Sequence, residues 1–410
     1  MKEPFLWGVA TSAFQLEGSP HADWASWDSI LTQAPQVTHH YDLYKKDLQL
    51  LKELGVNAYR FSIEWSRIQP HESQWNEEAV THYQEIIDIL KANDIEPIVT
   101  IHHFTHPLWF IRKYPWHTKA SVEKFLFFAE KLLASIKNVR YWITFNEPYV
   151  LVLGGYLEGC MPPGLRDVSL AVTALQNILT CHGKAYDAIH ARDPGAMVSV
   201  AHNMAALAPW KRWNPLDRLL ARIAKYFYNH SLLDAFLTGH LQVRFPFGRT
   251  YHISVPVKNK LDFFGVNYYT RIHIRFNPLK KMGVELRHHD IEGYGLTDMG
   301  WEIHPHGLEK VLRYASKLNL PIIITENGIA TRNDRKKIRF MKGHIDVLER
   351  CIKNGMDVRG FFYWSLIDNY EWLRGLDARF GLYRVDFSSL ERIPTKAALY
   401  YSYLIKSRRF

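Results

Sequence analysis

Cysteine is scarce in this chain of 410 residues, which has only Cys160, Cys181 and Cys351. An odd number of widely spaced cysteines argues against a disulfide framework or a cysteine-based metal site, so we expect three reduced thiols. The sequence also has no unbroken apolar run of the roughly 18 residues that a membrane-spanning helix needs. Residues 1–10 lack the apolar segment of a secretory signal. These absences predict a cytoplasmic protein without a membrane span.

Charge is abundant but is not concentrated in one region. The 51 Lys and Arg residues outnumber the 41 Asp and Glu residues, which gives a formal net charge of +10. Such an excess raises the question of a nucleic acid or an anionic surface as a partner. Only short basic clusters occur, at residues 332–339 and 406–409, and no nucleic-acid-binding motif accompanies them. We therefore interpret the basic residues as a solvated surface and expect no nucleic-acid partner.

Short β-rich runs alternate with longer amphipathic segments, such as 41–54, 77–93 and 121–136. This alternation is typical of a parallel α/β fold, and eight strands close a (β/α)8 TIM barrel. No linker or internal repeat divides the chain, so we predict a single catalytic domain over residues 1–410, with the active site at the C-terminal ends of the strands. The candidate strands are residues 5–10, 58–63, 96–102, 141–146, 197–201, 262–268, 322–326 and 360–365.

Two stretches rich in Pro, Gly, His and charge interrupt this alternation, at residues 19–38 and 277–298. We expect them to be long, irregular loops over the active face of the barrel. Loops in this position select the substrate.

Two glutamates follow predicted strands directly. Glu147 lies in Tyr141-Trp-Ile-Thr-Phe-Asn-Glu-Pro148, and Glu326 lies in Pro321-Ile-Ile-Ile-Thr-Glu-Asn-Gly328. Either motif alone is more often a helix cap or a turn. A parallel barrel, however, delivers both side chains to its C-terminal rim, where barrel enzymes carry out their chemistry. Two carboxylates that face one site are the minimal equipment for cleaving a glycosidic bond.

Six segments, in the order found here, resemble glycoside hydrolase family 1 and cover nearly the whole chain. The resemblance implies a (β/α)8 barrel with catalytic acids after the fourth and seventh strands, acting on β-glycosides with retention of configuration. The segments are Phe5-Leu-Trp-Gly-Val-Ala-Thr-Ser-Ala-Phe-Gln-Leu-Glu-Gly18, Asn57-Ala-Tyr-Arg-Phe-Ser-Ile-Glu-Trp65, Thr144-Phe-Asn-Glu-Pro148, Gly265-Val-Asn-Tyr-Tyr-Thr270, Ile324-Thr-Glu-Asn-Gly328 and Trp364-Ser-Leu-Ile-Asp-Asn-Tyr-Glu-Trp372.

The resemblance also implies roles for single residues. Glu147 matches the acid/base and Glu326 the nucleophile, while Arg60 and Tyr269 match the residues that support the nucleophile. A retaining mechanism needs the two carboxylates about 5 to 5.5 Å apart and in different protonation states at one pH. The residues that match sugar-binding positions are Gln15, His103, Asn146, Asn203, Tyr269, Trp364, Glu371 and Trp372.

The third strand departs from the family pattern. It continues as His103-Phe104-Thr105 where His-Trp-Asp is usual, which removes an indole beside the sugar and bears on the preferred epimer. The pair His102 and His103, with His106 nearby, also suggests a metal site. Alternation along a strand sends the first two to opposite faces, so we expect no metal. Nothing in the sequence indicates a cofactor.

The window after the eighth strand favours a neutral sugar over a sugar phosphate. Glu371 would repel a phosphate, and Ala378 stands where phospho-glycosidases have a lysine. Phe380 lies near a position that contacts the aglycone.

We therefore expect a retaining exo-β-glycosidase, most simply a β-glucosidase with some β-galactosidase or β-fucosidase activity. Two alternatives stay open: a transglycosylase that uses the same site, and an inactive sugar-binding barrel. The second alternative usually goes with loss of a carboxylate, and both are present here. The sequence gives no indication of the oligomeric state.

Overall fold

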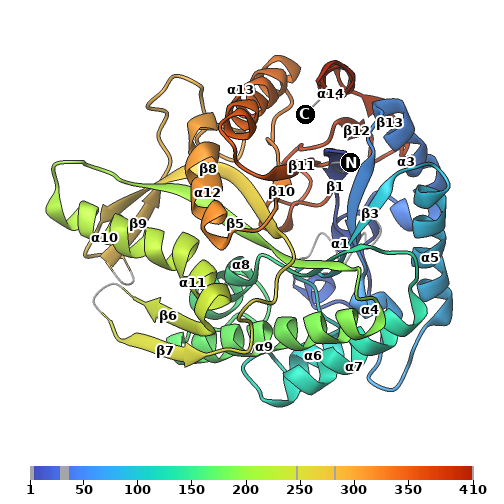
Figure 1. Ribbon diagram of the computed structural model, residues 1–410, viewed down its shortest axis with the longest axis horizontal. Helices are drawn as coiled ribbons and strands as arrows, with labels where there is room; N and C mark the ends of the chain where they lie inside the picture. The colour runs from blue at the N-terminus through green and yellow to red at the C-terminus, as the bar shows by residue number, and fades with distance from the viewer. Residues whose placement is uncertain (1–3, 28–36, 246–247, 281–282, 409–410) are drawn as a thin grey trace.

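The computed structural model describes residues 4–27, 37–245, 248–280 and 283–408. Within these ranges, eight parallel strands form a closed ring in the order β1, β2, β3, β4, β5, β8, β10, β11, and β11 pairs again with β1 (Figure 1). The predicted (β/α)8 barrel is therefore confirmed. The strands of the ring are β1 (Leu6–Ala10), β2 (Ala58–Ser62), β3 (Glu96–His102), β4 (Tyr141–Asn146), β5 (Met197–Pro209), β8 (Phe264–Phe276), β10 (Ile322–Asn327) and β11 (Val358–Trp364).

Strands β3 and β4 have the predicted bounds, and most others differ from them by one or two residues. Strands β5 and β8 run much further than predicted, because they leave the barrel together and pair with each other as far as Pro209 and Ile274. Strand β9 (Val284–Arg287) then adds to β8 in antiparallel fashion. Residues 284–287 of the irregular loop predicted at 277–298 therefore form a strand, which the sequence did not predict.

Long helices cover the outside of the barrel (Figure 1). Helix α3 shows why they form: Tyr44, Leu48 and Leu51 recur every three or four positions and are buried, and Gly55 ends the helix in a left-handed conformation. The predicted helices at 41–54, 77–93 and 121–136 are thus confirmed. The long helices are α3 (His40–Leu54), α5 (Glu77–Lys91), α7 (Ala120–Ser135), α9 (Val168–Arg192), α10 (Pro215–Lys225), α11 (Ser231–Thr238), α12 (Pro305–Ala315), α13 (Asp334–Lys353) and α14 (Lys396–Ser407).

Short elements fill the connections between them. Of the predicted loop at 19–38, residues 28–36 lie outside the described residues, and the described part includes a single 3₁₀ turn. The short elements are α1 (Ala13–Glu17), η1 (Trp24–Ser26), α4 (Trp65–Ile68), α6 (Leu108–Lys113), α8 (Pro148–Val152), η2 (Leu153–Glu158), η3 (Tyr226–His230), β6 (His240–Arg244), β7 (Thr250–Ser254), η5 (Ser316–Leu318), η6 (Trp372–Arg374), β12 (Tyr383–Val385) and β13 (Arg392–Pro394).

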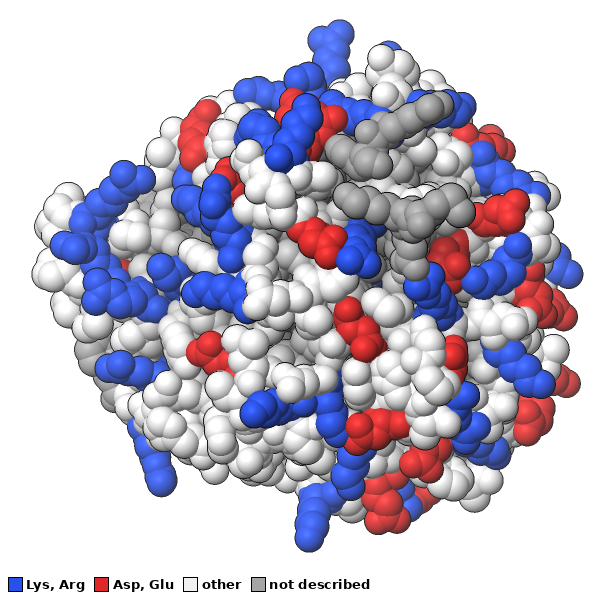
Figure 2. All heavy atoms as spheres, viewed as in Figure 1, with Lys and Arg blue, Asp and Glu red and all other residues white. Residues whose placement is uncertain are grey.

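The surface charge is spread over the face in view. Lys and Arg side chains lie along the whole outline of the molecule in Figure 2, and acidic side chains lie among them, mostly on the right of that view. Within the described ranges, no helix is long and apolar enough to cross a bilayer.

Candidate active site

Glu147 is held in an unusual backbone conformation directly after β4. Its φ of 45° lies in the left-handed region, which a non-glycine residue occupies only at a cost. Pro148 then begins α8, because its fixed φ suits the first position of a helix. The buried carboxylate accepts hydrogen bonds from Asn203 (2.8 Å) and Asn267 (2.7 Å). The residue for which an acid/base role was predicted is thus one of the described non-glycine residues with a positive φ.

Glu326 lies on β10 and faces a fixed cation. Arg60, from β2, donates to its Oε1 at 2.6 Å, and the Tyr269 hydroxyl donates to its Oε2 at 2.5 Å. Both partners are buried. Gly328 follows two residues after Glu326. A Cβ at this position would lie 1.9 Å from the Trp364 carbonyl oxygen, so only glycine allows the chain after β10 to pass this close to the end of β11.

A network of amides joins the two glutamates. The Asn146 oxygen accepts from Arg60 at 2.7 Å and from Asn267 at 3.1 Å, and its nitrogen lies 3.1 Å from His103 Nε2. Asn267 interacts with both Glu147 and Glu326. Strands β2, β4 and β8 thus fix the relative positions of both carboxylates through short polar contacts.

A second group of side chains lies next to this network. Gln15 donates to Glu371 at 3.2 Å and to the Tyr370 carbonyl at 2.8 Å. The His103 ring stacks on Trp364 (5.9 Å between centroids) and on Trp372 (6.2 Å). The structure therefore brings together every residue for which a catalytic or sugar-binding role was predicted, from Gln15 near the first strand to Trp372 beyond the last.

Burial raises the pKa values of the carboxyl groups in this site above their ordinary values. Burial and the charge of Glu326 raise the pKa of Glu147 to about 8, although Asn267 and Asn203 counteract the shift. Burial and Glu326 likewise raise the pKa of Glu371 to about 8. Burial also raises the pKa of Glu326, but Arg60 and Tyr269 oppose that rise. The cation beside Glu326 therefore favours one ionised carboxylate and one protonated neighbour at neutral pH.

The two adjacent histidines point to different surroundings, as alternation along β3 predicts. His103 reaches the amide network, whereas the His102 ring packs in the core near Trp116 and Phe145. Burial lowers the pKa of His102 well below its usual value, so this ring stays neutral. No cluster of three or more metal-ligating side chains occurs in the part of the chain that the structure describes.

Sequence reasoning missed two residues that shape the site. Tyr228, on the π-helical turn η3, donates to the Asn203 oxygen at 2.7 Å and so orients the amide that contacts Glu147. Trp301 packs edge-on against Tyr269, with 5.7 Å between centroids, and is only partly buried. Neither residue follows a barrel strand, so the strand-end pattern that found the others gave no signal for them.

Comparison with known proteins places this geometry in a family. The model of glycosyl hydrolase family 1 matches residues 1–410. β-Glucosidase A from Thermotoga maritima is 32% identical, over 99% of this chain and 97% of its own length. A β-glycosidase structure from Pyrococcus horikoshii is 38% identical with a TM-score of 0.92, and covers all of this chain and 96% of its own. The T. maritima β-glucosidase in complex with glucoimidazole is 30% identical, over 100% of this chain and 99% of its own, with a TM-score of 0.89.

The chain belongs to glycosyl hydrolase family 1, and it is a β-glycosidase.

Proposed function

We propose that the enzyme removes terminal, neutral β-glycosyl residues with retention of configuration, and that β-glucosides are its preferred substrates. The observation that carries this proposal is the pair of buried glutamates that share Asn267 but differ in charge environment. The names of the relatives support the choice of sugar, since the Thermotoga enzyme is a β-glucosidase and its solved complex holds glucoimidazole. We further infer a single catalytic domain that acts in the cytoplasm.

In the first step Glu326 attacks the anomeric carbon and the bond to the leaving oxygen breaks. Arg60 and Tyr269, at 2.6 and 2.5 Å, keep the attacking carboxylate ionised and aimed. Glu147, which holds its proton at neutral pH, gives that proton to the departing oxygen. In the second step the ionised Glu147 takes a proton from water, whose oxygen attacks the same carbon and releases Glu326.

The recognition of a neutral sugar follows from the side chains around Gln15. Glu371 and Gln15 offer adjacent acceptor and donor groups to sugar hydroxyls, and Trp364 and Trp372 offer flat apolar faces. A phosphate on this sugar would meet the Glu371 carboxyl group, and Ala378 supplies no cation to offset it. The absence of a cation at this position therefore disfavours sugar phosphates.

A transglycosylase reaction is the second candidate. The indole of Trp301 lies beside Tyr269 and provides a partly exposed apolar surface near the nucleophile. An acceptor alcohol bound there would compete with water in the second step. The ratio of transfer to hydrolysis products with added alcohol measures this competition. Since both carboxylates and their partners are in place, an inactive barrel is disfavoured.

The direct test is hydrolysis of a panel of aryl β-glycosides with gluco, galacto, fuco, manno and gluco-6-phosphate groups. We expect turnover of the gluco substrate, weaker turnover of galacto or fuco, and none of the 6-phosphate. The configuration of the first-formed sugar, measured by NMR, should be β. Preference for the 6-phosphate, or an α product, would contradict the proposal.

A further inference from the structure

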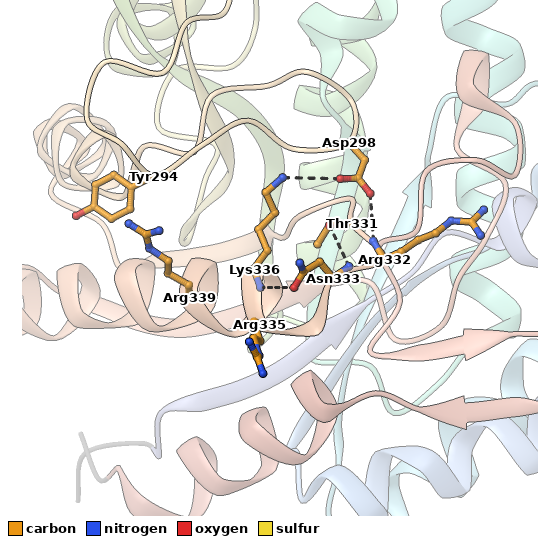
Figure 3. Close-up of a pocket in the computed structure, with 8 residues that line it drawn as sticks. All are labelled: Tyr294, Asp298, Thr331, Arg332, Asn333, Arg335, Lys336 and Arg339. Atoms are coloured by element: carbon orange, nitrogen blue, oxygen red, sulfur yellow. Dashed lines mark hydrogen bonds and ion pairs between the residues drawn. The ribbon is translucent and has the colours of Figure 1, made fainter.

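Lys337 lies inside the basic run at residues 332–339 but does not share its exposure. The sequence suggested a solvated surface for this run, and the neighbouring Lys336 is partly exposed and extends toward the Asp298 carboxylate, 3.9 Å away (Figure 3). The Lys337 side chain, one residue further along α13, is only 2% exposed. A buried ammonium group needs hydrogen-bond partners, because removing its charge from water without them is costly. The partners of this lysine therefore show what it does.

Those partners are three successive backbone carbonyl groups. Lys337 Nζ donates to the carbonyl oxygens of Arg379 (3.4 Å), Phe380 (3.1 Å) and Gly381 (2.6 Å). Among the described residues, the last two of these oxygens accept from this lysine alone. The segment 379–381 lies between η6 and β12 and belongs to neither, so no ladder of backbone hydrogen bonds holds it. The lysine thus supplies donors that a neighbouring strand would otherwise provide.

The charge of Lys337 has no direct ion-pair partner in the part of the chain that the structure describes. Its nearest carboxylates are engaged with other cations: Asp334 lies 3.1 Å from Arg384, and Asp368 lies 3.2 Å from Arg379. Burial lowers the pKa of the Lys337 ammonium group to about 8, and Asp368 and Asp334 oppose the change. The charged groups that act on it are Asp368, Asp334, Arg384 and Asp298. The ammonium group is therefore held chiefly by the carbonyl oxygens.

The segment 379–381 also lies against the catalytic site. Phe380 is buried, and its ring packs edge-on against Tyr269 with 6.2 Å between centroids. The Tyr269 hydroxyl donates to Glu326 at 2.5 Å. On its other side the segment is tightly packed, since a Cβ at Gly381 would lie 2.3 Å from the backbone of the chain after β11. An unbroken series of contacts thus runs from α13 to the nucleophile.

We propose that Lys337 is a positioning residue for Glu326 and acts through the segment 379–381. The lysine holds the segment, the segment seats Phe380 against Tyr269, and that contact keeps the Tyr269 hydroxyl on the carboxylate. The inference rests on the proposed function, in which Glu326 attacks the sugar. When the lysine is lost, the segment relaxes and the hydrogen bond from Tyr269 weakens. Because that bond favours the ionised carboxylate, its weakening raises the pKa of Glu326 further.

The test is the pH dependence of kcat/KM for an aryl β-glucoside, measured for the wild type, Lys337→Met, Phe380→Leu and the double variant. The acid limb of this profile reports the pKa of the nucleophile in the free enzyme. We expect Lys337→Met to move the limb upward by about 0.5 to 1 pH unit, as weakening of one hydrogen bond to a charged group allows. Phe380→Leu should move it in the same direction. The double variant should shift it no further than the larger single shift, because the two side chains act in series.

Lys336→Met is the matched control, since it removes the same charge from the same helix and leaves the segment 379–381 in place. It should keep the wild-type acid limb. A shift of equal size in this control would show a general effect of charge and would overturn the proposal. A lysine that only stabilises the fold would lower the melting temperature of Lys337→Met and leave the limb unmoved, which also overturns it.

Two further outcomes separate the steps of the proposal. Additive shifts in the double variant would show that Lys337 does not act through Phe380, and would overturn it. If Lys337→Met does not fold, the profile of Phe380→Leu decides: a shifted limb supports the contact with Tyr269, and an unmoved limb contradicts it. The wild type reports on the proposed function independently, because failure to hydrolyse the β-glucoside would count against that function and not against the role of the lysine.

Discussion

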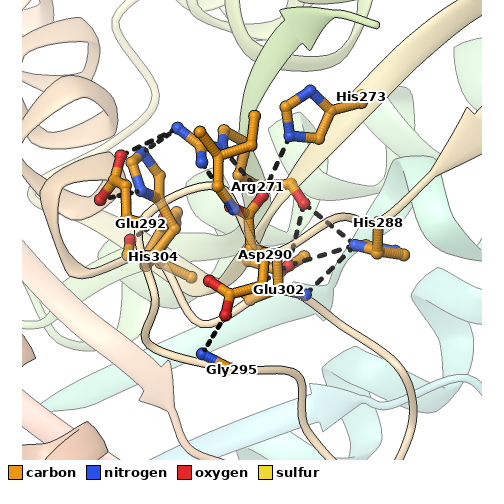
Figure 4. A network of polar contacts seen from close by, with 11 residues as sticks. Arg271, His273, His288, Asp290, Glu292, Gly295, Glu302 and His304 are labelled. Atoms are coloured by element: carbon orange, nitrogen blue, oxygen red, sulfur yellow. Dashed lines mark hydrogen bonds and ion pairs between the residues drawn. The ribbon is translucent and has the colours of Figure 1, made fainter.

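Two buried charge clusters adjoin each other on β8 and behave in opposite ways. Tyr269 joins the catalytic cluster, whereas Arg271, two residues later, joins a cluster outside the barrel that includes Glu292, Glu302 and His304 (Figure 4). Burial raises the pKa of Glu147 to about 8 in the first cluster. In the second, hydrogen bonds from His273 and Arg271 outweigh burial and lower the pKa of Glu302 to about 2.

The difference lies in the charge and number of the groups that donate hydrogen bonds to each carboxylate. Arg60 is the cation beside Glu326, while Glu147 and Glu371 are held by amides, so burial decides their protonation. Both carboxylate oxygens of Glu302 instead accept hydrogen bonds from Arg271, and one of them also lies 3.1 Å from His273 Nε2. Polar groups that are fully paired stabilise a loop, whereas incompletely paired carboxyl groups hold protons that a reaction can move.

The largest effect is expected from neutralising Glu326, which tests whether the first cluster serves catalysis. Glu326→Gln should lower turnover by about 10⁴-fold or more, because it removes the nucleophile. The fold should persist, since Arg60 keeps its hydrogen bonds to Asn146 and the Thr325 carbonyl. Steady-state rates with an aryl β-glucoside and a melting curve measure the two effects. A folded variant with near-normal turnover would refute the assignment of the nucleophile.

The same substitution in the second cluster should act on stability. Glu302→Gln leaves Arg271 buried with a weaker partner, and breaking a buried pair typically costs about 3 to 5 kcal/mol. Glu309→Gln is the matched control, because its ion pair with Arg313 is exposed and should change stability by less than about 1 kcal/mol. Denaturant unfolding compares them. Equal effects of the two variants would show that the Glu302 cluster does not hold the loop.

The proton on Glu147 should appear in the pH dependence of the rate. With its pKa at about 8, kcat/KM should fall above that pH, roughly tenfold for each further unit, as the acid is lost. Glu147→Gln should remove this alkaline limb when the substrate has a good leaving group that needs no proton. An unchanged limb in the variant would assign the titration to another residue.

The sequence predicted the barrel and its site because both depend on strand ends. Glu147 and Glu326 stand directly after apolar runs whose period identifies them as strands, and a closed barrel brings such ends together whatever the connections are. The bounds of β3 and β4 were predicted to the residue for the same reason.

What the sequence did not predict depends on partners that are distant along the chain. Strands β5 and β8 extend beyond the barrel because Ala206 pairs with Arg271 and Pro209 with Ile274, a match that neither segment indicates alone. Trp301 and Glu302 act from a loop that the Arg271 cluster fixes. The pKa values likewise follow from burial, which only the folded arrangement defines.

The smallest expected effect is a change in how stability depends on pH. Glu147 and Glu371 bind protons more tightly in the folded chain, where their pKa is about 8, than at the ordinary value of 4.5. Stability should therefore decline as pH rises through this window. Glu302 has a lowered pKa, so its contribution is present above 4.5 and is lost as pH falls toward 2. Melting temperatures between pH 3 and 9 should flatten on the alkaline side in Glu147→Gln and on the acid side in Glu302→Gln. If both variants keep the wild-type dependence of melting temperature on pH, these two clusters do not determine how stability depends on pH. The difference between the clusters would then affect catalysis alone.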